Sequence, residues 1–203
     1  MRDFVLGVTC VNGRGESLRF GGQVMKNVAG YDVSRLMVGA MGTLGAILDV
    51  SFKVLPVPES EQTRVYEVSE KVAIAKMNEW AGQPLPLSAA CYLKNELRIR
   101  LSGTEAGVVA AARELGGVQD PEGGPFWQAL REQCLPFFES AGVLWRLVVP
   151  PATPPLGLAG DTLVDWGGAQ RWLSTSQSDD TVRAAVQTVD GHATRFRGGD
   201  RSL

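Results

Sequence analysis

The stretch Lys26-Asn27-Val28-Ala29-Gly30-Tyr31-Asp32, followed by Gly39-Ala40-Met41-Gly42-Thr43-Leu44-Gly45-Ala46-Ile47, decides how this sequence is interpreted. Four glycines fall within sixteen residues there, and an apolar run that ends at Pro56 follows them. Glycine lets the backbone turn tightly and lets another group approach it closely. The spacing therefore predicts backbone N–H groups that line a large flat ligand or its pyrophosphate. Simple turns between core elements are the alternative that the residues alone leave open.

Length and composition limit the classes of protein. The chain has 203 residues, which fits one domain or two small ones, and 44% of them are hydrophobic. The formal net charge is −2 and the basic residues are scattered, whereas binding to nucleic acid needs concentrated positive charge. No apolar run approaches the roughly 20 residues that span a bilayer, and the N-terminus lacks a signal-peptide pattern. We expect a cytoplasmic protein without nucleic acid or an integral membrane segment, and peripheral association at the inner face of the plasma membrane stays open.

Cysteine and histidine usage excludes several kinds of site. Cys10, Cys91 and Cys134 are far apart and form no CxxC pair, so we expect buried free thiols and no metal site. His192 is the single histidine, and no HExxH, GxSxG or GxxxxGK[ST] motif occurs. The catalytic residues therefore stay unknown.

Residues 1–58 are predicted to form a small β-rich unit. Strands over 4–12 and 17–20 flank the turn signal Asn12-Gly13. A short helix over 33–38 begins at the N-cap Asp32 and ends at Gly39. A buried strand over 46–55 follows, and the change of composition at 56–61 predicts a domain boundary.

Residues 59–203 alternate between predicted strands and helices. The strands are expected over 63–68, 87–93, 97–101, 143–149, 163–166 and 193–196, and the helices over 71–81, 105–115, 125–138 and 181–189. Four prolines within 150–155 indicate a surface connector. This order predicts an α+β fold with helices on one face of an antiparallel sheet. The aromatic residues are expected to anchor either the core or a subunit interface; they are Trp127, Phe137, Phe138, Trp145, Trp166 and Trp172.

The sequence resembles the second half of a vanillyl-alcohol-oxidase-type, or PCMH-type, FAD-binding domain. That resemblance rests on Arg2 to Gly7, Gly21 to Asp32, Gly39 to Gly45, and the strand end Lys53-Val54-Leu55-Pro56. More closely, the chain resembles the E-subunit family of bacterial glycolate oxidases over essentially all its length. Asp165-Trp166-Gly167-Gly168-Ala169 and Gly191-His192-Ala193-Thr194-Arg195-Phe196 add to that match.

The resemblance implies the later part of a PCMH-type FAD-binding domain over 1–58 and an antiparallel-sheet-plus-helices cap domain over 59–203. It also implies an FAD-binding subunit that works with a catalytic flavin subunit and an iron–sulfur subunit to oxidise glycolate, a small 2-hydroxy acid, to glyoxylate. Electrons would then pass toward a respiratory acceptor. A non-catalytic scaffold subunit without effective flavin binding is the alternative, and an independent FAD-dependent 2-hydroxy-acid dehydrogenase is a third hypothesis.

Two departures from the family pattern matter. The other half of the flavin domain, with the Gly-rich pyrophosphate loop, is expected upstream of Met1, and a C-terminal stretch is expected beyond Arg201, so we expect a chain truncated at both ends that is inactive alone. Ala40-Met41 stands where the family often has Ser-Glu, so only backbone contacts are carried over.

The resemblance places two groups of site residues. The cofactor-binding group is Gly30, Tyr31, Gly39, Gly42, Thr43, Gly45 and Ile47. A buried tyrosine followed by a helix cap is the alternative for Tyr31-Asp32. His192 would face the flavin or substrate, with Arg195 as the partner of a carboxylate, since arginine suits bidentate carboxylate binding. A structural or surface histidine is the alternative for His192.

Overall fold

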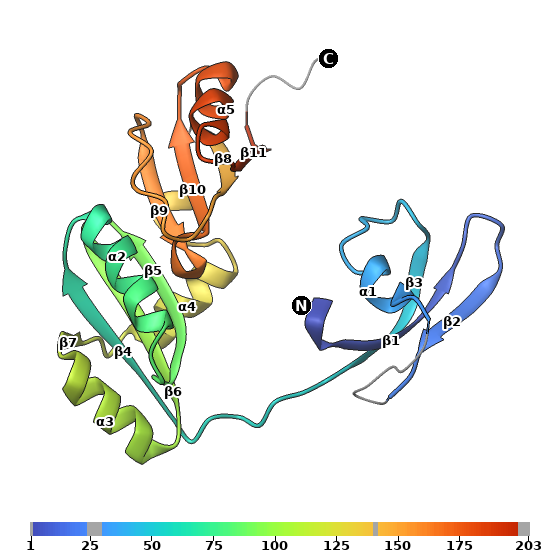
Figure 1. Cartoon of the computed structure of the whole chain (residues 1–203), viewed down its shortest axis with the longest axis horizontal. Helices are drawn as coiled ribbons and strands as arrows, with labels where there is room; N and C mark the ends of the chain where they lie inside the picture. The colour runs from blue at the N-terminus through green and yellow to red at the C-terminus, as the bar shows by residue number, and fades with distance from the viewer. Residues whose placement is uncertain (1, 24–29, 140–141, 199–203) are drawn as a thin grey trace. The chain divides into compact units, whose positions relative to one another are not determined.

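The computed structural model describes residues 2–23, 30–139 and 142–198 (Figure 1). The chain divides into two compact units, Met1–Val57 and Pro58–Leu203. Residues 24–29, which carry Lys26-Asn27-Val28-Ala29 of the quoted stretch, lie outside the described residues.

The N-terminal unit is a three-stranded antiparallel sheet in the order β2-β1-β3. Its elements are η1 (Arg2–Phe4), β1 (Val5–Val11), β2 (Ser17–Gly21), α1 (Val33–Met37) and β3 (Ala46–Phe52). The predicted turn at Asn12-Gly13 forms, because the Asn12 side chain accepts hydrogen bonds from the N–H groups of Arg14 and Glu16. The predicted helix cap is also confirmed: the Asp32 carboxylate accepts from the Arg35 N–H at 3.0 Å.

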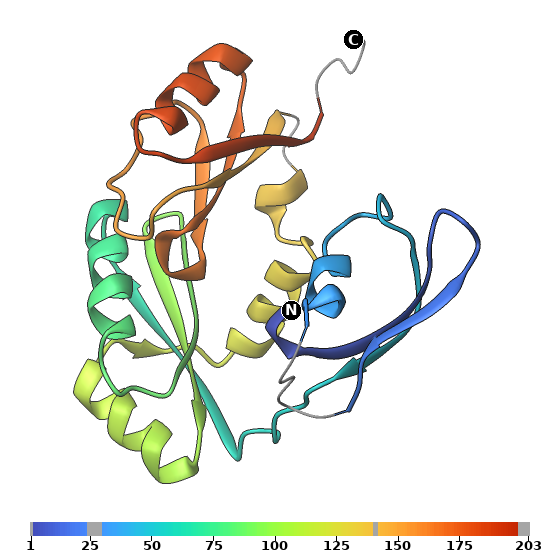
Figure 2. The same ribbon diagram turned by 45° about the vertical axis from the view of Figure 1, so that its right-hand side comes forward.

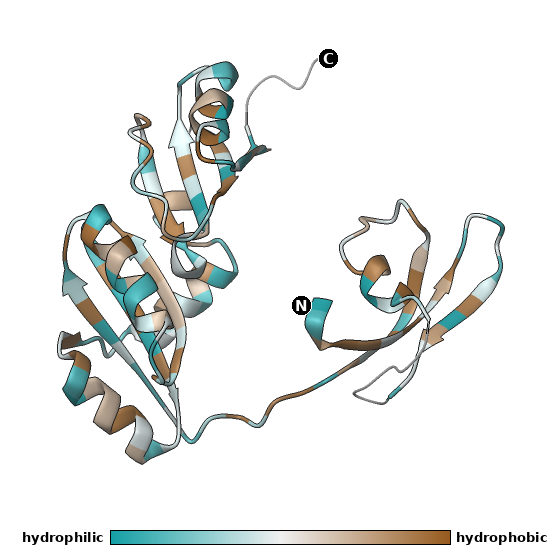
Figure 3. Ribbon diagram, viewed as in Figure 1, coloured by the Kyte–Doolittle hydropathy of each residue, from teal (hydrophilic) through white to brown (hydrophobic). Residues whose placement is uncertain are grey.

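The core of the N-terminal unit is small. Its buried apolar residues are Val5, Val8, Cys10 and Met37. The strand predicted over 46–55 ends at Phe52, and its first four residues are exposed, so the prediction of a buried strand was wrong. Hydrophobic residues run along β1 and β3 (Figure 3), but only β1, the central strand, buries a row of them. An apolar run therefore need not be buried, and within the described part of this unit β3 lies largely at the surface.

The C-terminal unit is an eight-stranded antiparallel sheet in the order β11-β8-β10-β9-β5-β6-β4-β7. Its strands are β4 (Ser60–Glu67), β5 (Leu87–Leu93), β6 (Glu96–Gly103), β7 (Val118–Gln119), β8 (Val143–Val148), β9 (Asp161–Asp165), β10 (Gln170–Thr175) and β11 (His192–Arg197). β5 and β6 pair through the Lys94-Asn95 turn, where both residues have positive φ. The mixed α and β content and the antiparallel pairing agree with the predicted class.

Helices cover both faces of this sheet. They are α2 (Glu70–Ala81), α3 (Glu105–Leu115), α4 (Gly123–Arg131) and α5 (Asp179–Gln187), with the short η2 (Pro136–Glu139) and η3 (Trp166–Gly168). One face packs against α2, α3 and α5 through two clusters. The other face packs against α4 and η2, which lie on the opposite side from α2 and α3 (Figure 2). The expectation of helices on one face only was therefore wrong.

The strand register separates the two faces. Leu163 belongs to the cluster under α4 and η2, while the next residue, Val164, belongs to the cluster under α2 and α3. Leu144 and Trp145 divide in the same way. We call the face of Leu144, Leu163 and Trp172 the second face.

Five of the six aromatic residues singled out in the sequence are core residues. Trp127, Phe137, Phe138, Trp145 and Trp172 are buried, whereas the Trp166 side chain is 72% exposed. Cys10 and Cys91 are buried free thiols as expected, but Cys134 is exposed, because it follows the end of α4 in a turn at the surface.

Candidate functional site

The four glycines of the quoted stretch share a backbone conformation but differ in what surrounds them. Gly30, Gly39, Gly42 and Gly45 all have positive φ, which strains any other residue. A Cβ on Gly45 would lie 2.4 Å from the Val11 carbonyl oxygen, so Gly45 is required for close packing against β1. A Cβ on Gly30 or Gly42 would meet nothing within 4 Å, so the bare backbone at these two positions faces open space.

The other residues of the expected flavin group differ in what they can offer. Tyr31 is 98% exposed, so the alternative of a buried tyrosine was wrong. Ile47 is also exposed, on β3. Thr43 is engaged locally, since its N–H and its hydroxyl both donate to the Ala40 carbonyl oxygen, at 3.0 and 2.6 Å. An open backbone beside an exposed aromatic ring fits one side of a flat cofactor, but Thr43 has no donor left for it.

The structure does not bring His192 and Arg195 together. His192 is exposed on β11, and the register places it on the second face. Arg195 lies on the opposite face, where it pairs with Asp179 at the start of α5 and lies over the Trp145 ring. The residue spacing of three puts the two side chains on opposite sides of a strand. Arg195 is therefore engaged in an internal ion pair, and its assignment to a substrate carboxylate stays a prediction.

A cavity of 730 Å³ lies on the second face, entirely within the C-terminal unit. It is bounded by β4 and β6 on one side, by α4 above, and by the η3 turn with β10 on the other side. The residues that determine its chemistry are Glu61, Arg100, Trp127, Asp165, Trp166 and Trp172. Asp165 and Trp166 belong to a motif that the sequence marked. Trp127 and Trp172 were expected only as core or interface anchors, and Glu61 and Arg100 were not expected at a site.

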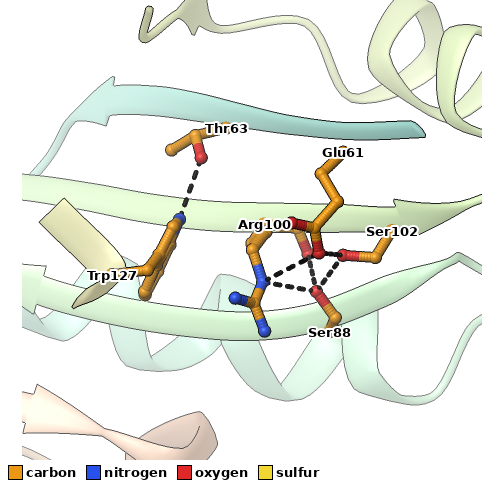
Figure 4. Close-up of polar contacts among 6 residues, drawn as sticks. All are labelled: Glu61, Thr63, Ser88, Arg100, Ser102 and Trp127. Atoms are coloured by element: carbon orange, nitrogen blue, oxygen red, sulfur yellow. Dashed lines mark hydrogen bonds and ion pairs between the residues drawn. The ribbon is translucent and has the colours of Figure 1, made fainter. Parts of the chain in front are cut away.

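Arg100 is held at the cavity by one edge of its guanidinium group. Its Nε donates to the Ser88 Oγ at 2.9 Å and lies 3.7 Å from the Glu61 Oε1. Ser102 hydrogen bonds to the same Glu61 oxygen at 2.5 Å and contacts the Ser88 Oγ at 2.7 Å. Figure 4 shows both terminal nitrogens of Arg100 pointing away from this cluster. Within the described part of the chain, these two nitrogens have no hydrogen-bond partner.

Trp127 forms the wall beside Arg100. Its Nε1 donates to the Thr63 Oγ1 at 2.9 Å, which is a buried hydrogen bond that fixes the plane of the indole (Figure 4). The Arg100 guanidinium carbon lies 5.8 Å from the centre of that ring, within the range of a cation–π contact. Gly123 makes this packing possible, because a Cβ there would lie 2.1 Å from the Thr63 Oγ1.

Asp165 is the titratable group on the far side of the cavity. Burial raises the pKa of its carboxyl, and hydrogen bonds from the Trp166 N–H and the Gln170 side chain oppose that rise. Cys91 pairs with Asp165 in the β5–β9 register, and burial, with the nearby Asp165 charge, raises the pKa of its thiol well above the ordinary value. Cys91 is therefore a protonated thiol at neutral pH and not a nucleophile.

The η3 turn presents Trp166 at the rim of the cavity. Trp166 has φ +50°, a left-handed conformation that is costly for a residue with a side chain. The turn is held from behind, because Asn78 Nδ2 donates to the carbonyl oxygens of Gly167 and Pro151, each at 3.2 Å. The Asp165 carboxylate accepts from the Trp166 N–H at 2.7 Å. These contacts hold the backbone of the turn and leave the exposed indole of Trp166 at the rim of the cavity.

The sequence held one signal for this cavity. In Glu96-Leu97-Arg98-Ile99-Arg100-Leu101-Ser102, polar and apolar residues alternate strictly, and the structure buries Leu97, Ile99 and Leu101 under α2 and α3. The alternation predicts a polar opposite face, but it does not tell which arginine is paired. Arg98 is neutralised by Glu96 and Asp120, whereas Arg100 keeps its terminal nitrogens open.

No group of three or more His, Cys, Asp or Glu residues in the described ranges could hold a metal ion. Across those ranges, no helix has both the length and the apolar character that crossing a membrane requires.

Comparison with known proteins gives three informative similarities, although no family model matches the chain. The chain is 50% identical over 200 residues to glycolate oxidase subunit GlcE of Escherichia coli (strain K12), an alignment that covers 98% of this chain and 57% of GlcE. It is 45% identical over 62 residues to glycolate oxidase subunit GlcD of Bacillus subtilis (strain 168), covering 30% of this chain and 13% of GlcD. It is 42% identical over 59 residues to a D-lactate dehydrogenase of Anaerostipes hadrus, covering 29% and 12%.

The extent of these matches differs greatly. The chain spans little more than half the length of GlcE, and only about an eighth of the other two proteins is aligned. The resemblance expected from the residues is confirmed at the level of sequence: along nearly all of its length, this chain is similar to the glycolate oxidase subunit GlcE.

Proposed function

We propose that this chain is part of an FAD-associated subunit of a glycolate-oxidising complex, which converts glycolate to glyoxylate and passes electrons toward a respiratory acceptor. The observation that carries the proposal is the 50% identity to GlcE over 98% of the chain. The shorter similarities to GlcD and to a D-lactate dehydrogenase support the same reaction class, oxidation of a 2-hydroxy acid. A catalytic flavin subunit and an iron–sulfur subunit are the proposed partners.

In this proposal, residues 1–58 form the later part of a PCMH-type FAD-binding domain and residues 59–203 form its cap domain. The backbone at Gly30 and Gly42, open to the surroundings, would approach the cofactor. The exposed ring of Tyr31 and the side chain of Ile47 would contact its flat part. FAD, when bound, supplies hydride acceptance and onward electron transfer. Gly39 and Gly45 would set the turns that bring these groups to one side, and Thr43 would stabilise the turn through Ala40.

The experiment is flavin retention by the assembled complex. The complex is purified with this subunit carrying Tyr31→Ala, and the visible flavin absorbance per complex is compared with the wild type. Tyr31 is 98% exposed, so its truncation should leave folding intact and lower flavin retention. Val118→Ala, at a 72% exposed position of the C-terminal unit, is the matched control and should change nothing. Equal flavin content in all three would remove Tyr31 from the site.

A scaffold role without flavin is the second candidate, and one observation favours it. The N-terminal unit exposes large apolar side chains that a partner could cover, among them Leu36, Met41, Leu48, Val54 and Leu55. If the wild-type subunit, isolated from the dissociated complex and supplied with excess FAD, stays colourless while the complex still needs it for assembly, the scaffold function replaces flavin binding.

A further inference from the structure

We infer that the 730 Å³ cavity of the C-terminal unit binds a planar organic carboxylate larger than a two-carbon hydroxy acid, with the carboxylate on the terminal nitrogens of Arg100 and the ring among Trp127, Trp166 and Trp172. The inference goes beyond the proposed function, because every residue in it belongs to the C-terminal unit and none was assigned to the flavin.

The anion site is the open edge of Arg100. Guanidinium groups bind carboxylates through two parallel N–H···O bonds, and that geometry needs two adjacent donors that are not already used. Glu61 and Ser88 contact only the Nε of Arg100, so they orient the group and leave its two terminal nitrogens for a ligand (Figure 4).

The acidic residues around the cavity do not oppose an anion strongly. Glu61 accepts a hydrogen bond from Ser102, and its Oε1 lies 3.7 Å from the Nε of Arg100, on the edge of the guanidinium away from the two open nitrogens (Figure 4). Asp120 pairs with Arg98 at 3.1 Å. Asp165 lies at the end of β9, two strands from β6, and its carboxyl accepts hydrogen bonds from the Trp166 N–H and the Gln170 side chain. Arg131, at the end of α4, adds a second cation to the lining, although it also contacts Glu132 at 2.8 Å.

The size of the cavity argues for a ligand beyond glycolate. One water molecule accounts for about 30 Å³ of liquid volume, so an acid of five non-hydrogen atoms would fill a small part of 730 Å³. Pockets for organic ligands typically measure several hundred Å³, and the lining here combines three tryptophans with charged and amide side chains, so it offers partners for both a ring and a carboxylate.

The walls favour a flat ligand. Trp127 is fixed by its bond to Thr63, and Trp172 is fixed edge-on between Phe138 and Phe196, with ring centres 5.5 and 4.9 Å away. Trp166 is held at the rim by a strained and well-supported turn, while its ring stays 72% exposed. An exposed indole that lines the same cavity as an open guanidinium suits stacking of a ring whose carboxylate reaches Arg100.

The test is binding of 2-naphthoate to the purified full chain without added FAD, followed by calorimetry and by saturation-transfer NMR. The neutral analogue 2-naphthalenemethanol measures the contribution of the charge, and glycolate measures the contribution of size. We expect saturable binding of 2-naphthoate at least tenfold tighter than that of either other probe. Arg100→Gln should abolish the preference for the acid, and Arg100→Lys should keep part of it, because lysine retains the charge without the fork.

Two further variants separate a site from a folding defect. Trp166→Ala removes an exposed side chain, so the variant should fold normally and bind 2-naphthoate several-fold more weakly. Arg113→Gln, at an exposed position on α3, should bind as the wild type does. Absence of 2-naphthoate binding, equal affinity for the acid and the alcohol, glycolate binding as tight as 2-naphthoate, or insensitivity to both Arg100→Gln and Trp166→Ala would each overturn the inference. No FAD is added in this test, and none of these variants changes a residue assigned to the flavin. A failure of the carboxylate site therefore leaves the proposed flavin role untouched, and a failure of the flavin role leaves the carboxylate site untouched.

Discussion

The two units of this chain bury their apolar residues to very different degrees. The C-terminal unit has three buried clusters that cover both faces of an eight-stranded sheet. The N-terminal unit has one cluster of four buried residues, while it exposes large apolar side chains along β3 and the segment after it. The comparison teaches that the C-terminal unit covers both faces of its sheet with its own residues, whereas the described residues of the N-terminal unit leave apolar side chains of its sheet exposed.

Separating the units at residue 58 should give the largest effect. We expect residues 58–203 to unfold cooperatively with a midpoint close to that of the full chain, because their core lies within the piece. We expect residues 1–57 alone to show no cooperative transition, because a unit of this size with so small a core does not offset its chain entropy. Circular dichroism during heating measures both, and a cooperative transition in the short piece would break the comparison.

Core truncation sharpens the same contrast. Leu101 in β6 is fully buried, so Leu101→Ala should lower the free energy of unfolding by about 2–5 kcal/mol. Leu48 in β3 is 61% exposed, so Leu48→Ala should change it by less than about 0.5 kcal/mol. Urea titration of the full chain gives both values. A large loss at Leu48 would show that the N-terminal sheet is covered within this chain.

A substitution of the buried Arg171 tests whether its hydrogen bonds hold the proline-rich connector in the C-terminal unit. Arg171 in β10 is buried, and its guanidinium donates to the carbonyl oxygens of Thr153, Pro154 and Gly168. Arg171→Met keeps most of the apolar stem but leaves those oxygens without their donor, which should cost about 1–3 kcal/mol. Urea titration measures the loss, and proteolysis within 150–158 should speed up. Wild-type stability together with unchanged proteolysis would contradict this role.

The smallest effect is a dependence of stability on pH at the cavity. Burial raises the pKa of Asp165 in the folded chain, so the folded state resists ionisation. Its contribution to stability is therefore present below the pKa of the unfolded chain, near 3.8, and is lost as pH rises through the folded pKa. Asp165→Asn does not titrate and keeps an oxygen for the Trp166 N–H. The melting temperature of this variant should exceed that of the wild type at pH 7, and the excess should shrink at pH 4. An excess that is the same at both pH values would show that Asp165 does not titrate between them.

Local signals in the sequence predicted most elements at the correct places. Asp32 caps α1 as predicted, through a bond from the N–H three residues on. The structure adds Thr104 as a cap of the same kind for α3, which ends at Gly116 with φ +69°. The helix predicted over 105–115 has those bounds in the structure. The strand alternation of 96–102 is likewise visible in the residues alone. These features depend on neighbours within a few residues, so the sequence contains what determines them.

The strand β10 was missed, and the reason is physical. Gln170, Arg171, Ser174 and Thr175 make the segment appear polar, yet all six residues of β10 are buried between β8 and β9. Their polar groups are satisfied by distant partners, such as the Thr153 and Pro154 carbonyls for Arg171 and the Ala159 carbonyl for Thr175. A pattern of hydrophobicity cannot show a buried strand whose hydrogen-bond partners lie fifteen or more residues away.

In the candidate site, too, some features depend on residues close in the sequence and others on distant partners. The sequence by itself determined the glycine turns of the N-terminal unit and the similarity to GlcE, because both depend on residue identity and order. Only the tertiary structure decided that Arg195 forms an ion pair with Asp179. It also decided that Arg100, whose Nε donates to Ser88, keeps its two terminal nitrogens open between β4 and α4. Whether an arginine is paired or available depends on which side chains the sheet order brings beside it. That order joins residues from Glu61 to Trp172 around one cavity, and no local pattern encodes it.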